Sequence, residues 1–236
     1  MLHAPDSSKK SESWKIFDQI YSTYDRVNSL LSMGIDKRWR RELAARLPSG
    51  QLELLDLATG TGAQLFSLMT LSTNITTATG IDLSEQMLKV AREKAGPFAD
   101  RAKFLHADAL SLPFKAETFD CATISFGIRN VAEVSVCMKE VYRVLKRKGR
   151  FLILEFSLPT NPVVKPLYLL YLRHLLPTIG GLLSKNLPAY RYLNQTIESF
   201  PYGKAFCDLL EEASFCRVTA TPLTYGIATL YSGDKV

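Results

Sequence analysis

One segment constrains the fold of this chain more than any other: Glu53–Gly62, which reads ELLDLATGTG. An apolar run typical of a buried strand ends there in two glycines, and a segment of helical character, Ala63–Leu71, follows directly. Glycines at such a junction let the backbone turn sharply and approach a ligand without a Cβ clash. The segment is neither G-x-G-x-x-G, because Leu65 stands in the third position, nor a Walker loop. Taken alone, the glycines therefore fit a plain strand-to-helix turn equally well.

Strand-like and helix-like segments alternate along most of the chain. Strands are expected at 52–58, 76–82, 102–106, 119–125, 150–156, 217–221 and 226–231, with helices between them. A helix expected over 131–145 should carry the basic residues 146–148 in or just past its last turn, with Gly149 after it. The alternation predicts an α/β fold: a Rossmann-like, doubly wound, mostly parallel seven-stranded sheet with helices on both faces.

Helical segments are expected outside this sheet as well. Residues 1–13 are predicted to form a disordered tail and 14–236 a single domain, in which 14–48 form N-terminal helices. The alternation stops between 160 and 200, where the apolar stretch 163–183 contains charged residues and prolines and is too interrupted to span a membrane. This stretch is either a lid-like helical insertion over a site or a set of helices packed on the sheet.

Three further elements follow the glycines in the order that a nucleoside site requires. Asp82 ends the second strand, about 20 residues after the glycines, where a carboxylate can bind both ribose hydroxyls. Ser84 suits the N-cap of the next helix, so Asp82 is not needed for that role. Asp108 follows the third strand, where it can accept a hydrogen bond from an adenine amino group. Asp56, inside the first strand, either supports the glycine turn or lies near an ammonium group of the ligand.

The order of these elements resembles that of class I S-adenosylmethionine-dependent methyltransferases. The resemblance implies S-adenosylmethionine as cofactor and a site in which Gly60 and Gly62 face the methionine part. Asp82 would bind the ribose, Asp108 and Ala109 would meet the adenine, and the strand ending at Ser125 would form the floor. In a narrower family of this class, to which further motifs point, the cofactor contacts fall on the positions that are here Thr61, Asp82, Asp108, Ala109 and Ser125.

Further motifs narrow the resemblance to the ubiquinone/menaquinone biosynthesis C-methyltransferase family, from Phe17 to Leu230. They are YDRVN at 24–28, SFGIRN at 125–130, LEFS at 154–157 and YRYL at 190–193. Tyr24 and Asp25 are secondary candidates for the site. The chain departs from the family at Ala63, where an acidic residue usually follows the glycines. Asp56, water or the backbone would therefore have to hold the amino end of the cofactor.

The family resemblance implies methylation of a ring carbon in a polyprenylated quinol, and the tail of such a substrate favours the lid interpretation of 160–200. The menaquinone branch would convert demethylmenaquinol to menaquinol; the alternatives are 2-methoxy-6-polyprenyl-1,4-benzoquinol of ubiquinone biosynthesis or a different small molecule. Arg129 and Asn130 are the catalytic candidates: Arg129 could stabilise a phenolate and Asn130 could bind a quinol oxygen. Alternatively, Arg129 pairs with an acid and Asn130 caps the next helix.

Composition restricts the partners. The formal net charge is +6, but the basic residues are dispersed, so nucleic acid is not expected as a partner. The four cysteines and three histidines are too scattered for a metal site. The first residues are polar and lack the apolar region of a signal peptide, so a cytoplasmic protein is predicted. A peripheral contact with anionic membrane lipid is compatible with the charge, and the oligomeric state is left open.

Overall fold

The computed structural model describes residues 12–236 apart from 33 and 185. Its centre is a seven-stranded sheet with the order β3-β2-β1-β4-β5-β7-β6. The strands are β1 (Leu52–Leu57), β2 (Ile75–Asp82), β3 (Ala102–His106), β4 (Phe119–Ser125), β5 (Leu145–Phe156), β6 (Cys216–Leu223) and β7 (Ala228–Asp234). β7 is antiparallel to both of its neighbours, and the pairs from β3 to β5 are parallel. The predicted mostly parallel, Rossmann-like sheet is confirmed.

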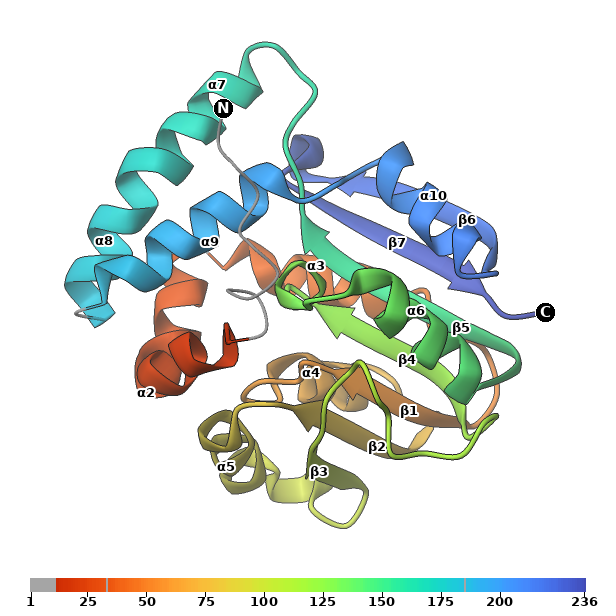
Figure 1. Cartoon of the computed structure of the whole chain (residues 1–236). Helices are drawn as coiled ribbons and strands as arrows, with labels where there is room; N and C mark the ends of the chain where they lie inside the picture. The colour runs from red at the N-terminus through yellow and green to blue at the C-terminus, as the bar shows by residue number, and fades with distance from the viewer. Residues whose placement is uncertain (1–11, 33, 185) are drawn as a thin grey trace.

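Helices cover both faces of the sheet because its central strands are apolar on both sides (Figure 1). In β1, Leu54 packs into the core formed with α3 (Ile35–Ala44), α4 (Ala63–Leu71) and α5 (Glu85–Lys94). Its neighbour Leu55 packs into the opposite core with α6 (Val134–Val144) and α10 (Lys204–Glu212). Successive residues of a strand point to opposite faces, so a doubly covered strand is apolar throughout.

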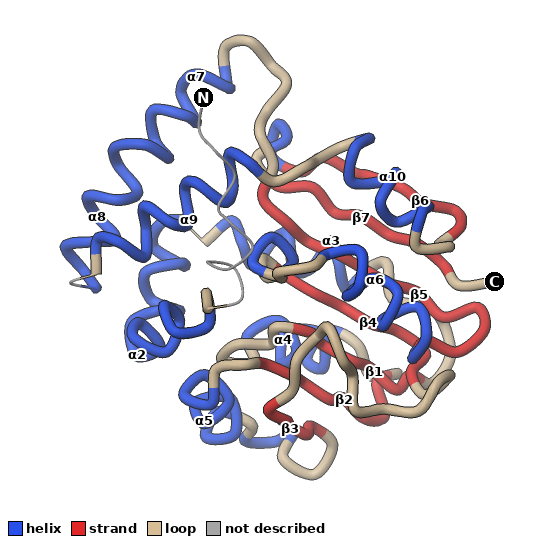
Figure 2. Tube along the Cα trace, in the orientation of Figure 1, coloured by secondary structure: helices blue, strands red, loops and turns tan. Residues whose placement is uncertain are grey.

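A second group of helices lies beyond the sheet, on the side of the carboxyl ends of β1, β4 and β5 (Figures 1 and 2). It consists of α2 (Trp14–Leu31), α7 (Val164–Leu170), the π-helical turn η3 (Tyr171–Leu175), α8 (Leu176–Ser184) and α9 (Leu187–Ser199). Their buried side chains, among them Ile20, Leu172 and Ile197, form a separate apolar cluster. The segment 160–200 therefore has its own packing, distinct from the two faces of the sheet.

Short 3₁₀ turns complete the secondary structure: η1 (Gly96–Phe98), η2 (Ile128–Asn130) and η4 (Thr224–Gly226). Of the predicted tail 1–13, residues 1–11 lie outside the described residues. Ser13 is described and buried, and its hydroxyl donates to the carbonyl oxygen of Asn130 (3.4 Å).

Several predicted boundaries are wrong. The helix expected over 131–145 begins at Val134, and the last strand, expected over 226–231, is β7 (Ala228–Asp234). The largest error is at the start of β5. The helix expected to reach 145 ends at Val144, and β5 begins at Leu145, so the basic residues 146–148 belong to a strand. Lys146 is held there by carboxylates of β1 and β4, because its Nζ donates to Glu53 (2.7 Å) and to Asp120 (3.0 Å). These partners are distant in sequence, so a local helix-end pattern could not reveal them.

Candidate functional site

The glycine turn between β1 and α4 has a backbone that side chains rarely permit. Gly60 and Gly62 have φ values of 56° and 79°, in the left-handed region that favours glycine. A Cβ on Gly62 would lie 2.5 Å from the ring of Phe66, whereas the space around Gly60 is open. Gly62 is the N-cap of α4, while Gly60 lines both of the cavities described next.

Asp82 fastens this turn to the end of β2. One oxygen of its carboxylate accepts from the backbone N–H of Gly60 (2.8 Å), and the other accepts from that of Ser84 (2.9 Å). Ser84 is the N-cap of α5, as predicted, since its hydroxyl accepts from the N–H of Met87 (3.2 Å). Burial raises the pKa of Asp82, so the site contains a desolvated carboxyl group with fixed geometry.

Asp82 lies in a cavity of about 150 Å³ at the carboxyl ends of β2, β3 and β4. The structure brings most of the predicted cofactor residues together there: Gly60, Asp82, Asp108, Ala109 and Ser125 all line this smaller cavity. Thr61 lines the adjoining larger cavity instead. In doubly wound folds, ligands bind at the strand ends where the strand order reverses, and β1 and β4 form that point here.

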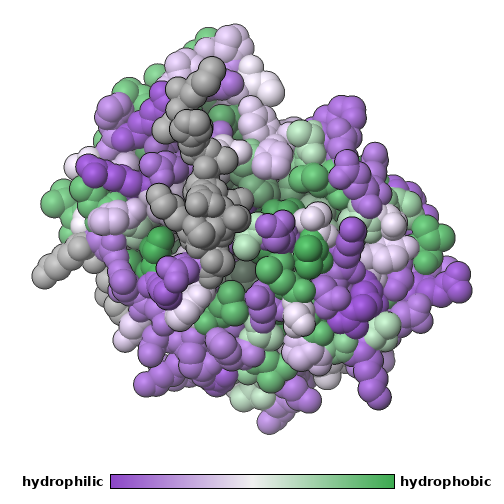
Figure 3. All heavy atoms as spheres, in the orientation of Figure 1, coloured by the Kyte–Doolittle hydropathy of each residue, from purple (hydrophilic) through white to green (hydrophobic). Residues whose placement is uncertain are grey.

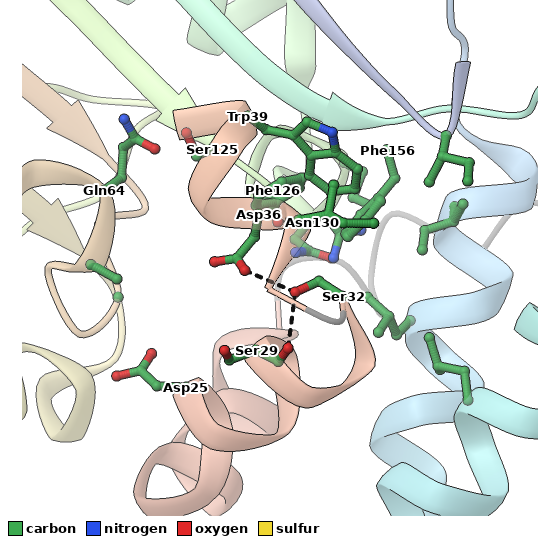
Figure 4. Close-up of a pocket in the computed structure, with 18 of the residues that line it drawn as sticks. Asp25, Ser29, Ser32, Asp36, Trp39, Gln64, Ser125, Phe126, Asn130 and Phe156 are labelled. Atoms are coloured by element: carbon green, nitrogen blue, oxygen red, sulfur yellow. Dashed lines mark hydrogen bonds between the residues drawn. The ribbon is translucent and has the colours of Figure 1, made fainter. Parts of the chain in front are cut away.

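The larger cavity, of about 610 Å³, extends from the glycine turn to the second group of helices, which comprises α2, α7, η3, α8 and α9 (Figure 4). It shares Gly60, Ser125 and Asn130 with the smaller cavity. Ser125 Oγ and Asn130 Oδ1 are buried, and within the described part of the chain neither has a hydrogen-bond partner. Unsatisfied buried polar atoms are costly, so these two fit contacts to a polar ligand such as the predicted cofactor.

Asp56 is buried under the turn. Its carboxylate accepts from the hydroxyls of Thr59 (2.7 Å) and Thr123 (2.6 Å), and the residue lines the larger cavity. Of the two interpretations, support for the turn is visible, although through the Thr59 side chain and not through the backbone. Burial is the main cause that raises its pKa to about 6. Asp56 therefore titrates near neutral pH.

Arg129 is buried in an ion pair. Its Nη1 lies 2.7 Å from Glu155 Oε1, and it also donates to the carbonyl oxygen of Phe126. Only 2% of Arg129 is exposed, and burial raises the pKa of Glu155. The structure thus shows the pairing with an acid that the sequence left open. Arg129 also lines the larger cavity, and its Nε has no partner among the described residues.

Asn130 does not cap the next helix. The N-cap of α6 is Glu133, and Asn130 ends the turn η2, so the capping interpretation is wrong. Asp25, a secondary candidate, accepts from the hydroxyl of Thr61 (2.8 Å) and pairs with Lys94. It thereby connects α2 to the glycine turn. The side chain of Tyr24, the other secondary candidate, lies outside the described residues.

The sequence analysis missed one contribution to the site, that of α3. Asp36, Trp39 and Arg40 all line the larger cavity. Residues three and four apart share one face of a helix, so their spacing was a usable signal. The ring of Trp39 lies near Phe126 and Phe156, with centroids 5.9 and 6.1 Å away, and builds an aromatic wall beside the polar groups.

Comparisons with known proteins agree with the predicted class of protein. Fold and site define an S-adenosylmethionine-dependent methyltransferase. Residues 6–235 match the model of the ubiE/COQ5 methyltransferase family, and the chain belongs to that family. It is 47% identical over 224 residues to the ubiquinone/menaquinone biosynthesis C-methyltransferase UbiE of Syntrophotalea carbinolica. The alignment covers 93% of this chain and 92% of the relative.

Two further comparisons extend the match. The chain is 41% identical to the demethylmenaquinone methyltransferase of Clavibacter sepedonicus, with 100% of this chain and 95% of the relative covered. A methyltransferase structure from Thermotoga maritima superimposes with a TM-score of 0.65 at 20% identity, over 95% of this chain and 100% of that one. The predicted class and cofactor are confirmed, and the structural likeness supports the fold.

The buried ion pair predicts a stability effect. We expect Arg129→Ala to lower the free energy of unfolding by roughly 3–5 kcal/mol, because Glu155 is left buried without its cation. Urea denaturation measures this loss. The double variant Arg129→Met/Glu155→Gln removes both charges and should recover more than half of it. A loss no larger than that of Arg147→Ala, a change at an exposed arginine, would contradict the pairing.

Asp56 predicts a pH dependence. Its folded pKa of about 6 exceeds the ordinary 3.8, so its contribution to stability is complete below about pH 4 and is lost as the pH rises through 6. Relative to Asp56→Asn, the unfolding free energy of the unmodified protein should fall by on the order of 3 kcal/mol between pH 4 and 7. Denaturation series at several pH values measure this. Asp100→Asn, at an exposed position, should parallel the unmodified protein.

Proposed function

We propose that the protein methylates a ring carbon of a polyprenylated quinol, converting demethylmenaquinol to menaquinol. The names of the relatives point to this reaction, and both branch names occur among them. The observation that carries the proposal is the larger cavity, which joins the predicted cofactor residues to an apolar space. The benzoquinol of ubiquinone biosynthesis is the alternative substrate.

The polar residues of the cavity suit the chemistry of the ring. When bound, S-adenosylmethionine would supply an electrophilic methyl group and leave as its neutral thioether, while the ring carbon would lose its proton to a base so that the ring becomes aromatic again. Asn130, at the junction of both cavities, binds a quinol oxygen through its side-chain amide and orients the ring. The guanidinium of Arg129 lines the larger cavity and stabilises the negative charge of the phenolate. Glu155 fixes the guanidinium in place. In this role Arg129 contributes to both stability and turnover.

The apolar side of the cavity suits an isoprenoid tail. It is lined by Leu172 of η3, Leu176 of α8 and Ile197 of α9, together with Ile20 of α2. Leu172 is only 1% exposed, so these side chains form an inner wall and not a surface. Burial of a prenyl chain against them contributes about 25 cal/mol per Å² of apolar area.

The opposite side of the same helices is suited to a membrane surface. Apolar side chains that line neither cavity are exposed there at Val163, Leu170, Leu175 and Leu182. Within the described ranges, no helix has both the length and the hydropathy needed to cross a bilayer. Figure 3 shows apolar residues at the α8 edge of the molecule, next to polar ones. We propose a peripheral contact of this face with anionic lipid, from which the tail enters the cavity.

Transfer of a labelled methyl group tests the reaction. The protein is incubated with labelled S-adenosylmethionine and either reduced demethylmenaquinone or the benzoquinol, each with a short tail. We expect the label in the naphthoquinol product. Label in the benzoquinol alone would select the alternative, and label in neither would reject the proposal.

Replacement of the exposed leucines tests the membrane contact. Leu170→Ser/Leu175→Ser should reduce sedimentation with anionic vesicles several-fold and slow turnover on long-tailed quinol, while short-tailed quinol in detergent is unaffected. The control Leu71→Ser/Val136→Ser removes exposed apolar side chains from α4 and α6. Equal loss of vesicle binding in both variants would show that the exposed apolar side chains of α7, η3 and α8 have no special role in the membrane contact.

A further inference from the structure

One side of the larger cavity carries a polar arrangement without an assigned role. Gln64, in the first turn of α4, is buried (4% exposed), and its Oε1 accepts from Arg40 Nη1 (2.9 Å). Its Nε2 is buried and has no partner in the part of the chain that the structure describes. Because Arg40 occupies the oxygen of the amide, the nitrogen is left as an oriented hydrogen-bond donor.

Arg40 is itself held from several sides. Its Nε lies 3.6 Å from Asp36 Oδ2, and its guanidinium lies 5.9 Å from the centre of the Phe126 ring. Asp36 is fixed by the hydroxyl of Ser32 (2.8 Å; Figure 4). The arrangement offers a fixed cation and an amide donor, with the carboxylates of Asp25 and Asp36 lining the same side of the cavity. Opposite charges at close range suit a zwitterion.

We propose that Arg40 and Gln64 bind the α-carboxylate of the methionine part of the cofactor. Gln64 follows Gly62 by two residues and lines the same cavity as Gly60, which the family resemblance places at the methionine part. The amino end of α4 adds a favourable field for an anion. The carboxylates of Asp25 and Asp36 face the α-ammonium group. Arg40 combines charge with a planar set of donors that matches a carboxylate.

This assignment explains the departure at Ala63. Ala63 is exposed and carries no polar group, so it cannot hold the amino end of a ligand. The neighbouring Gln64 and the α3 residues Asp36 and Arg40 supply the polar groups instead. In the family's usual arrangement an acidic residue after the glycine turn would bind the methionine end of the cofactor. Here residues at the contact between α3 and α4 take that role.

Calorimetry with two ligands tests the proposal. S-adenosylhomocysteine has the amino acid part, and 5′-methylthioadenosine has the same nucleoside and thioether without it. Gln64→Glu keeps the shape of the side chain, pairs with Arg40 and places a negative charge where the α-carboxylate would lie. We expect this variant to lose about tenfold or more of its affinity for S-adenosylhomocysteine, and less than twofold for 5′-methylthioadenosine.

Two controls separate the outcomes. Gln51→Glu makes the same charge change at an exposed position and should alter neither affinity. Arg40→Met should reproduce the selective loss of Gln64→Glu. An equal loss for both ligands, or no loss for either, would overturn the assignment. Because no quinol is present, the result is independent of the proposed substrate.

Discussion

The hydrogen bond between the Asp82 carboxylate and the Gly60 backbone is the contact on which the site depends. It ties the end of β2 to the turn after β1, and the second oxygen of Asp82 fixes the start of α5 through Ser84. The smaller cavity opens beside this contact, and Gly60 leads into the larger one. A residue predicted to bind ribose therefore also holds together the backbone beside the smaller cavity.

Local signals were sufficient for the parts of the structure that local physics determines. The turn at Gly60 and Gly62 requires positive φ values, and β3, β4 and α4 were predicted with the bounds that the structure has. The start of β5 could not be predicted, because Lys146 is drawn into the sheet by carboxylates on β1 and β4. A single sequence does not show which distant side chains will meet.

The same limit explains what was missed at the site. That Arg129 could pair with an acid was foreseen, but Glu155 as the partner was not, because 26 positions separate the two. The polar contact between α3 and α4 was also invisible, although the spacing of Asp36, Trp39 and Arg40 placed them on one helix face. Helix faces can be predicted from spacing, whereas the contact between two helices depends on the packing of the whole sheet.

Buried carboxyl groups gather at the ends of the strands, where a cationic ligand would be favoured. Asp56, Asp82 and Glu155 lie near the ends of β1, β2 and β5, and burial raises the pKa of each. Glu155 is neutralised by Arg129, but within the described residues Asp56 and Asp82 form no ion pair. A cationic sulfonium nearby would relieve this desolvation, whereas the neutral thioether left after methyl transfer would not. The same buried carboxylates would thus favour binding of the methyl donor over its product.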